Sequence, residues 1–193
     1  MSPTLTGAVR APTAVRGSAF RRSARARRPR HRSGLLLTLQ RRVRSWSPTR
    51  RDLEHWASEA LGRHGEGREL GVCTVGEAES AQLNGRFRGQ DKPTNVLSFA
   101  AAQLPVAALG VPPLLGELVI CPRVLAAEAR AEEKTLRAHW AHLVVHGVLH
   151  LVGFDHVKTE DARRMERREI RVLRRLGFDN PYRVRPPLPA VRA

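Results

Sequence analysis

The sequence contains only two cysteines, Cys73 and Cys121, and they have no metal-ligand spacing to each other. Both lie in short apolar runs that are typical of strands. We therefore expect reduced, buried thiols in a cytoplasmic protein, not a disulfide or a cysteine-based zinc site. Apolar runs long enough to span a bilayer are also missing, so no membrane-spanning helix and no membrane partner are predicted.

Acidic residues are missing from residues 1–34, which contain nine arginines and are rich in Ser, Ala and Pro. The segment has neither an apolar period nor the apolar centre of a secretory signal, so we predict a disordered extension. Its composition resembles an organelle transit peptide, and it equally suits an RNA-binding arm or a start codon placed too far upstream. We favour a dispensable extension.

Lysine is scarce, with three lysines among the 34 residues that are Lys or Arg, whereas the net charge is +16. Such a charge favours a polyanionic partner, with nucleic acid first and an anionic membrane second. Without the nine arginines of residues 1–34 the rest of the chain still carries +7. The alternative is a solvated basic surface in a protein of biased composition, which the scarcity of lysine partly supports.

Strands and helices are mixed in the remaining pattern without a strict β-α-β alternation. We therefore predict one α+β domain over residues 35–180, built as a small mixed sheet packed with helices, and a loose basic tail over residues 181–193. Asn84 and Gly85 are expected to stop the second helix. Strands are predicted over 35–39, 69–75, 95–99 and 117–121, and helices over about 48–60, 77–83, 122–134, 136–151 and 159–176.

Three histidines, His146, His150 and His156, give the most specific motif of the chain. The first two are four residues apart, which places both rings on one face of a helix. Gly153 permits the backbone conformation that ends a helix, so the chain can turn back and bring His156 toward the other two. Three imidazoles with an open fourth position are typical of catalytic zinc. We predict one Zn²⁺ per chain, held on a helix and the turn after it.

The same spacing occurs in the zinc-protease pattern His-Glu-x-x-His-x-x-Gly-x-x-His, but Gly147 stands where that pattern has its glutamate. The glutamate is the general base of those proteases, and glycine has no side chain for this task. A metalloprotease is therefore the second choice among enzymes. We interpret His139 and His142, which precede the motif on the same helix, as hydrogen-bonded core or rim histidines.

Three segments together are similar to one family: the run from Leu83 to Phe99 with Arg-Gly-Gln-Asp-Lys-Pro-Thr-Asn-Val-Leu-Ser-Phe, the run from Leu115 to Cys121, and His139-Trp140-Ala141-His142 continuing into the histidine motif. They resemble the YbeY family of bacterial zinc-dependent endoribonucleases. The resemblance implies a single-strand-specific endoribonuclease that matures the 3′ end of 16S ribosomal RNA and takes part in late 70S ribosome quality control. It also implies ribosomal RNA and small-subunit proteins as partners and a cytoplasmic location.

By the same resemblance the zinc ligands are His146, His150 and His156, and the catalytic residues are His146 and Arg88. Arg88 is expected to bind an RNA phosphate through paired hydrogen bonds, and the alternative is a structural ion pair. Asp155 is expected to orient a ligand, to act as a base, or to be a solvated acid at the helix end. A third class of function stays open, a ribosome-assembly factor whose zinc is only structural.

Overall fold

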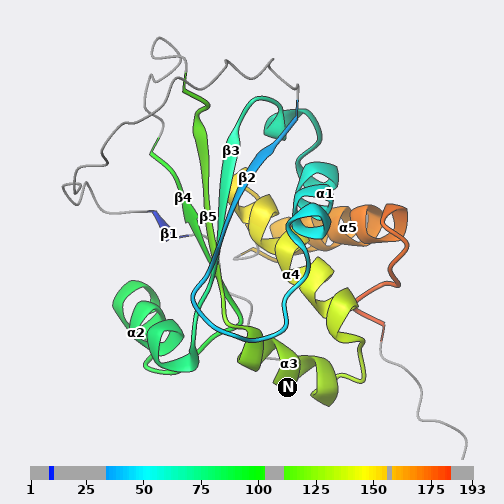
Figure 1. Cartoon of the computed structure of the whole chain (residues 1–193). Helices are drawn as coiled ribbons and strands as arrows, with labels where there is room; N and C mark the ends of the chain where they lie inside the picture. Colours follow the sequence, from blue (N-terminus) through cyan, green and yellow to red (C-terminus); the bar gives the residue numbers. More distant parts are fainter. Residues whose placement is uncertain (1–8, 11–33, 103–110, 156–157, 184–193) are drawn as a thin grey trace, which may run out of the picture.

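The computed structural model describes residues 9–10, 34–102, 111–155 and 158–183. Within them one sheet has the strand order β1-β4-β5-β3-β2 (Figure 1). Neighbouring strands are parallel except β4 and β5, which are antiparallel, so the sheet is mixed as predicted. The strands are β1 (Val9–Arg10), β2 (Leu36–Arg41), β3 (Glu69–Thr74), β4 (Val96–Ala100) and β5 (Leu114–Ile120).

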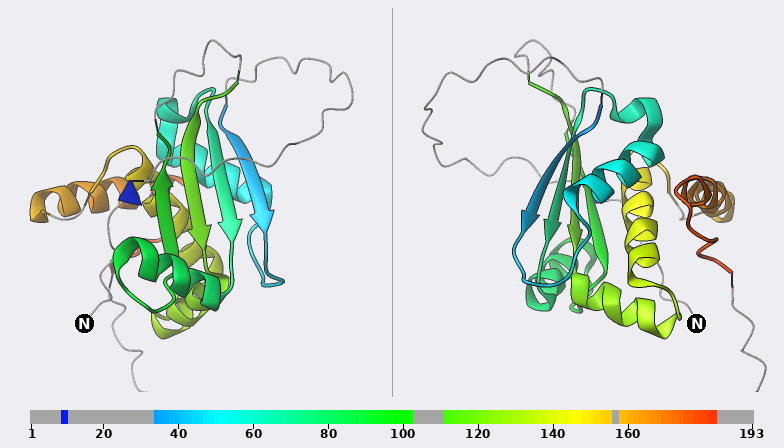
Figure 2. Two further views of the ribbon diagram at one scale, coloured as in Figure 1. Left: turned by 90° about the vertical axis from the view of Figure 1, so that its left-hand side faces the viewer. Right: turned by 45° about the vertical axis from the view of Figure 1, so that its right-hand side comes forward.

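Helices cover both faces of the sheet. α1 and α4 pack on one face, α2 lies on the other, and α5 packs on the outside of α4, away from the sheet (Figure 2). α4 is therefore enclosed between the sheet and α5. The helices are α1 (Arg50–Leu61), α2 (Glu77–Arg88), α3 (Pro122–Ala131), α4 (Leu136–Leu151) and α5 (Thr159–Arg175), with a 3₁₀ turn η1 (Gly62–Gly65) after α1. The predicted single α+β domain is confirmed.

The core fills the space between the sheet and α4. Leu118 and Ile120 of the central strand β5 are fully buried, and so are Trp140, Val144 and Val148 of α4. Successive side chains of a strand point to opposite faces of the sheet, so every second side chain of β5 points toward α4. This packing fixes α4 against the sheet and makes it a rigid support for any side chain that it carries.

The expected stop of α2 at Asn84 and Gly85 is wrong, because the helix continues to Arg88. Asn84 is buried and donates a side-chain hydrogen bond to the carbonyl of Lys92. A side chain at position 85 would collide with the Asp91 carboxylate. Both residues therefore serve tertiary packing, and the helix ends at Gly89, which has a left-handed φ of 67°.

Several other predictions fall at the borders of the described residues. β5 begins three residues earlier than expected, and residues 103–110, between the predicted strands 95–99 and 117–121, lie outside the described part. Of the predicted extension, Val9–Arg10 pairs with β4, and residues 1–8 and 11–33 lie outside the description, as do residues 184–193 of the predicted tail. Cys73 and Cys121 are buried free thiols, as expected. No described helix has the length and apolar character to cross a membrane.

Candidate metal centre

α4 carries four buried histidines, His139, His142, His146 and His150, each at most 5% exposed. The helix begins after Thr135, whose hydroxyl accepts a hydrogen bond from the backbone N–H of Ala138. The spacing of three, four and four residues keeps the four rings on one side of the helix. A row of imidazoles therefore runs along α4 inside the protein, where each ring needs a defined hydrogen-bond partner.

The end of α4 fixes the last of these rings. Gly153 has a φ of 91°, and the N–H of Phe154 donates back to the carbonyl of Leu149, which closes the helix with the turn that the sequence predicts. In this turn the carbonyl of Phe154 lies 2.9 Å from Nδ1 of His150. A carbonyl only accepts hydrogen bonds, so Nδ1 carries the proton and Nε2 of neutral His150 has the lone pair.

Glu169 of α5 fixes the ring of His146. Its Oε1 lies 2.8 Å from Nδ1 of His146, and the carboxylate is fully buried. Burial alone would raise the pKa of Glu169, but hydrogen bonds from His142 and His146 outweigh it and hold the pKa well below the usual range. The ionised carboxylate accepts, so His146 also has its proton on Nδ1 and its lone pair on Nε2.

The Nε2 lone pairs of His146 and His150 face each other. Nε2 of His146 and Nε2 of His150 are 3.1 Å apart. Two neutral acceptors at this distance repel each other unless a proton or a cation lies between them. Zinc–nitrogen bonds of about 2.0–2.1 Å at a tetrahedral angle separate two ligand nitrogens by about 3.3 Å. The donor type, the tautomers and the spacing of this pair therefore fit Zn²⁺, in agreement with the sequence.

The third predicted ligand, His156, lies outside the described residues. Among the described residues no group of three His, Cys, Asp or Glu side chains is arranged to hold a metal ion. The described structure therefore brings two of the three predicted ligands together, and the turn at Gly153 leads toward the third.

Gly147 lies against the sheet at the level of this pair. A Cβ at position 147 would come within 2.8 Å of Leu118 Cδ2 and 3.1 Å of Ser98 Oγ. A side chain here would point into the sheet, toward β5 and β4. The missing glutamate therefore has a packing reason: α4 approaches the sheet too closely at this turn to carry one.

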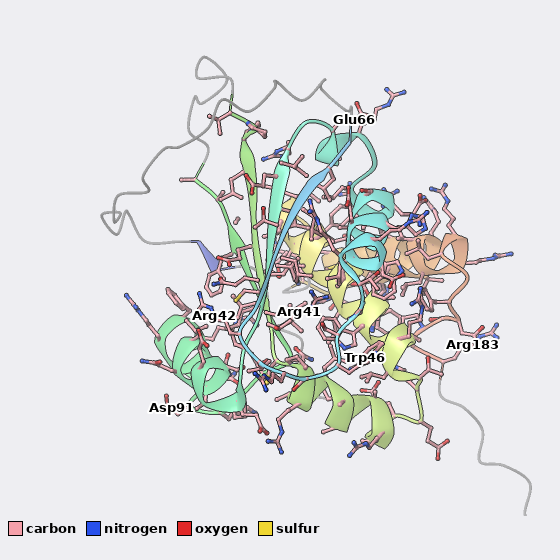
Figure 3. The ribbon with its side chains drawn as sticks, in the orientation of Figure 1. Arg41, Arg42, Trp46, Glu66, Asp91 and Arg183 are labelled. Carbon is pink, nitrogen blue, oxygen red and sulfur yellow. The ribbon has the colours of Figure 1, made fainter. Side chains whose placement is uncertain are left out.

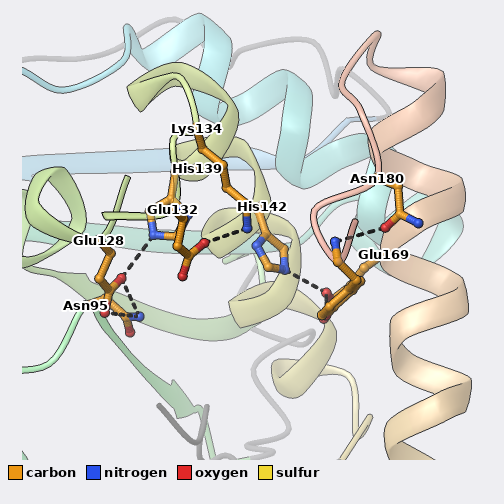
Figure 4. A network of polar contacts seen from close by, with 9 residues as sticks. Asn95, Glu128, Glu132, Lys134, His139, His142, Glu169 and Asn180 are labelled. Atoms are coloured by element: carbon orange, nitrogen blue, oxygen red, sulfur yellow. Dashed lines mark hydrogen bonds and ion pairs between the residues drawn. The ribbon is translucent and has the colours of Figure 1, made fainter. Parts of the chain in front are cut away.

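The first two histidines of the row are held in a different way. Nε2 of His139 lies 3.0 Å from Oε2 of Glu128, whose carboxylate also accepts from the amide of Asn95 (Figure 4). Nε2 of His142 lies 2.9 Å from Oε2 of Glu169. Among the described residues the Nδ1 atoms of both rings are buried without a hydrogen-bond partner. The prediction that these two are buried, hydrogen-bonded histidines is confirmed for Nε2 only.

Sequence reasoning missed Glu169 and Tyr182. Glu169 shares the buried face of α5 with Met165, Val172 and Leu173, and an acid inside an apolar stripe was the available signal. Tyr182 belongs to the segment predicted as a loose tail, yet its hydroxyl donates to Oε2 of Glu169. Its ring also contacts His142 edge to face, with centroids 5.4 Å apart. The site therefore includes α5 and the residues after it.

Arg88 is the last residue of α2 and is half-buried, and burial lowers the pKa of its guanidinium. Its neighbour Phe87 packs edge to face on Phe99 of β4, with centroids 5.0 Å apart. Gly147 of α4 packs on Ser98 from the other face. α2 and α4 therefore pack on β4 from its two faces, with Arg88 at the end of α2 and the histidine pair on α4.

Asp155 is exposed at the end of the turn. The described partners of Nδ1 of His146 and His150 are Glu169 and the carbonyl of Phe154, and the roles expected of Asp155 stay predictions. It borders a cavity of about 230 Å³ beside the turn. The remaining lining residues are Val152, Gly153, Phe154, Asp161 and Arg164.

Comparison with known proteins adds two findings. The model of the family described as Endoribonuclease YbeY matches residues 40–177. The solution structure of TM1509 from Thermotoga maritima is 24% identical in sequence, with a TM-score of 0.48, and the match covers 80% of this chain and 99% of that one. The family match includes all four buried histidines of α4, Glu169 and Arg88, and it ends five residues before Tyr182.

Proposed function

The chain belongs to the YbeY endoribonuclease family, and from this membership we propose that its histidine pair is the core of a zinc site that cleaves single-stranded RNA. As a family member it is an endoribonuclease of ribosomal RNA processing. The finer proposal is maturation of the 3′ end of 16S ribosomal RNA and late quality control of 70S ribosomes, with small-subunit proteins as partners in the cytoplasm. The observation that carries the zinc site is the 3.1 Å approach of the two Nε2 atoms.

We assign the metal to His146, His150 and His156. When bound, Zn²⁺ supplies a Lewis acid that polarises a phosphoryl oxygen and lowers the pKa of a water molecule. His146 and His150 provide lone pairs on Nε2 because their Nδ1 protons are held by Glu169 and Phe154.

Arg88 is proposed to bind a phosphate of the substrate. A guanidinium presents paired donors that match two phosphate oxygens, and partial burial makes the charge less hydrated and its field stronger. Because α2 and α4 pack on opposite faces of β4, the substrate strand is expected to contact both the end of α2 and α4. This placement separates the phosphate-binding charge from the elements that hold the metal.

The exposed face of α5 supports RNA as the partner. Six arginines of this helix are exposed, against three exposed acids, and a surface of this kind attracts polyanions. A further arginine, Arg183, lies at the edge of the molecule after α5 (Figure 3). A peptide substrate gains nothing from this charge, and Gly147 leaves no room for the glutamate base of a metalloprotease. Both observations favour RNA over protein as the substrate.

The direct test incubates zinc-loaded protein with single-stranded RNA, duplex RNA and casein, beside His146→Ala. We expect cleavage of single-stranded RNA alone, loss of this activity in the variant, and about one zinc per wild-type chain by mass spectrometry. Casein cleavage would favour the metalloprotease. Zinc without any cleavage by the wild type would favour the assembly factor with structural zinc. RNA cleavage that persists in His146→Ala at the wild-type rate would remove the histidine pair from the reaction.

A further inference from the structure

Glu169 is the meeting point of the buried polar network. Its Oε1 accepts from His146, and its Oε2 accepts from Nε2 of His142 and from the hydroxyl of Tyr182. The side chain is fully buried beneath α4 (Figure 4). Among the described residues no lysine or arginine forms an ion pair with it. One carboxylate therefore gathers three donors from α4 and from the chain after α5.

A buried carboxylate without a cationic partner is costly, because the charge has left water. Three hydrogen bonds offset part of this cost. A divalent cation on the far side of the His146 ring offsets more, because the imidazole transmits the attraction between carboxylate and metal. Carboxylates that accept from the second nitrogen of a metal-bound histidine raise its basicity and fix its orientation. The geometry of Glu169 toward His146 is of this kind.

We propose that Glu169 is a positioning residue for the zinc site, held in place by His142 and by Tyr182 from beyond the family match. The inference rests on the proposed function, since it assumes that His146 binds the metal. It also gives His142 a role beyond that of a core histidine. His142 and Tyr182 orient the Glu169 carboxylate, and this carboxylate fixes the tautomer of His146.

The chain offers a matched control in Glu128. It also holds a buried histidine of α4, at 3.0 Å, but it binds Nε2 of His139 and has no contact with His146 or His150 among the described residues. Glu128→Gln therefore removes, from α3, another carboxylate that holds a buried histidine of α4. If Glu169 acts only through general stability, the two substitutions should change zinc binding alike.

The test measures zinc affinity by competition with a chelator and the visible absorption of the Co²⁺-substituted full chain, for wild type, Glu169→Gln, Glu128→Gln and Tyr182→Phe. A glutamine at 169 cannot accept from all three donors, and an amide N–H facing His146 would move the ring proton to Nε2. We expect zinc affinity to fall about 10–100-fold in Glu169→Gln, with shifted Co²⁺ bands. Glu128→Gln should leave the zinc affinity and the Co²⁺ bands unchanged. Tyr182→Phe should lower the zinc affinity by less than Glu169→Gln does.

Wild-type affinity and wild-type Co²⁺ bands in Glu169→Gln would overturn the inference, and so would an equal loss in Glu128→Gln. If Glu169→Gln does not unfold cooperatively, Glu169→Asp replaces it, because the shorter carboxylate cannot reach both histidines and should also weaken zinc binding; wild-type affinity there would overturn the inference too. A wild-type protein that binds no zinc would instead refute the proposed metal site, so the two failures are distinguishable.

Discussion

His139 and His146 lie on the same buried helix and each is held by a buried or half-buried carboxylate, yet of the two it is His146 whose ring nitrogen lies 3.1 Å from that of another histidine. The difference lies in the ring nitrogen that is held. In the first half of α4, Glu128 and Glu169 take the outer nitrogen, Nε2, of His139 and His142. In the second half the partners take Nδ1, the nitrogen next to the backbone, and the two Nε2 atoms lie 3.1 Å apart. The partner of each ring therefore decides which nitrogen of the histidine carries the proton.

The largest effect should come from removing a ring of the second half. His150→Ala leaves two of the predicted ligands, and two ligands hold zinc poorly. Zinc content of the desalted protein should fall to near zero by mass spectrometry, together with RNA cleavage. The matched change in the first half, His139→Ala, should keep both. Equal zinc loss in the two variants, or full zinc content in His150→Ala, would contradict the proposed difference between the two halves of α4.

A smaller loss of RNA cleavage is expected when Arg88, at the end of α2, is replaced. Arg88→Ala should retain zinc, because Arg88 is on neither half of α4, and should lose about 10–100-fold of RNA cleavage through the missing charge-assisted hydrogen bonds. Lysine should restore only part of it, since a point charge cannot replace the planar fork. Turnover, zinc content and melting temperature are measured on one preparation.

The control for Arg88 is Arg86→Ala, which removes another guanidinium of α2. The Arg86 side chain is exposed, and its Cζ lies 5.2 Å from the centroid of the Phe87 ring. It should leave cleavage nearly unchanged. An Arg88→Ala protein that is destabilised, zinc-loaded and fully active would identify Arg88 as a structural ion-pair residue.

The second half of α4 lies close to the sheet at Gly147, and Gly147→Ala tests how tight this contact is. The added Cβ would meet Leu118 and Ser98 at 2.8 and 3.1 Å, so α4 must shift. Overpacking of this kind costs about 1–3 kcal/mol of unfolding free energy, measured by urea denaturation. Gly34→Ala is the control, since nothing lies within 4 Å of its Cβ. An unchanged stability of Gly147→Ala would show that the helix yields easily here.

The smallest effect is expected on stability, in the first half of α4, where Arg137 donates a hydrogen bond to Asp52 of α1. Asp52 accepts from Thr49 at the start of α1 and, at 2.8 Å, from Arg137 of α4. These two bonds lower the pKa of Asp52. A lowered pKa gives stability that is complete above the unfolded pKa of about 3.9 and is lost as the pH falls through the folded value.

Asp52→Asn should therefore reduce the free energy of unfolding by about 0.5–1 kcal/mol at pH 7, and the difference from wild type should vanish in acid. Zinc content should not change. Glu66→Gln, which removes an exposed carboxylate (Figure 3), is the control and should show no pH-dependent difference. A persistent difference at pH 2 would contradict the assignment to the Asp52 charge.

The sequence predicts the part of the site that lies within one helix and its turn. The spacing of His146 and His150 and the glycine at 153 convert directly into geometry, because the helical period is fixed. Glu169 and Tyr182 depend on how α5 packs on α4, and no local pattern contains that information. The same limit explains α2, where Asn84 and Gly85 read as a stop but serve contacts with the following loop.

All the groups that fix the histidine pair come from the last third of the chain. α4 has little exposed surface, so it needs the completed sheet, and His146 has no acceptor for its Nδ1 proton until Glu169 is in place. Synthesis runs from the N-terminus, so a growing chain carries both histidines before it carries the carboxylate, and it gains Tyr182 last. Folding of the site therefore depends on residues that are synthesised after both histidines, and a chain without α5 lacks the carboxylate that holds His146.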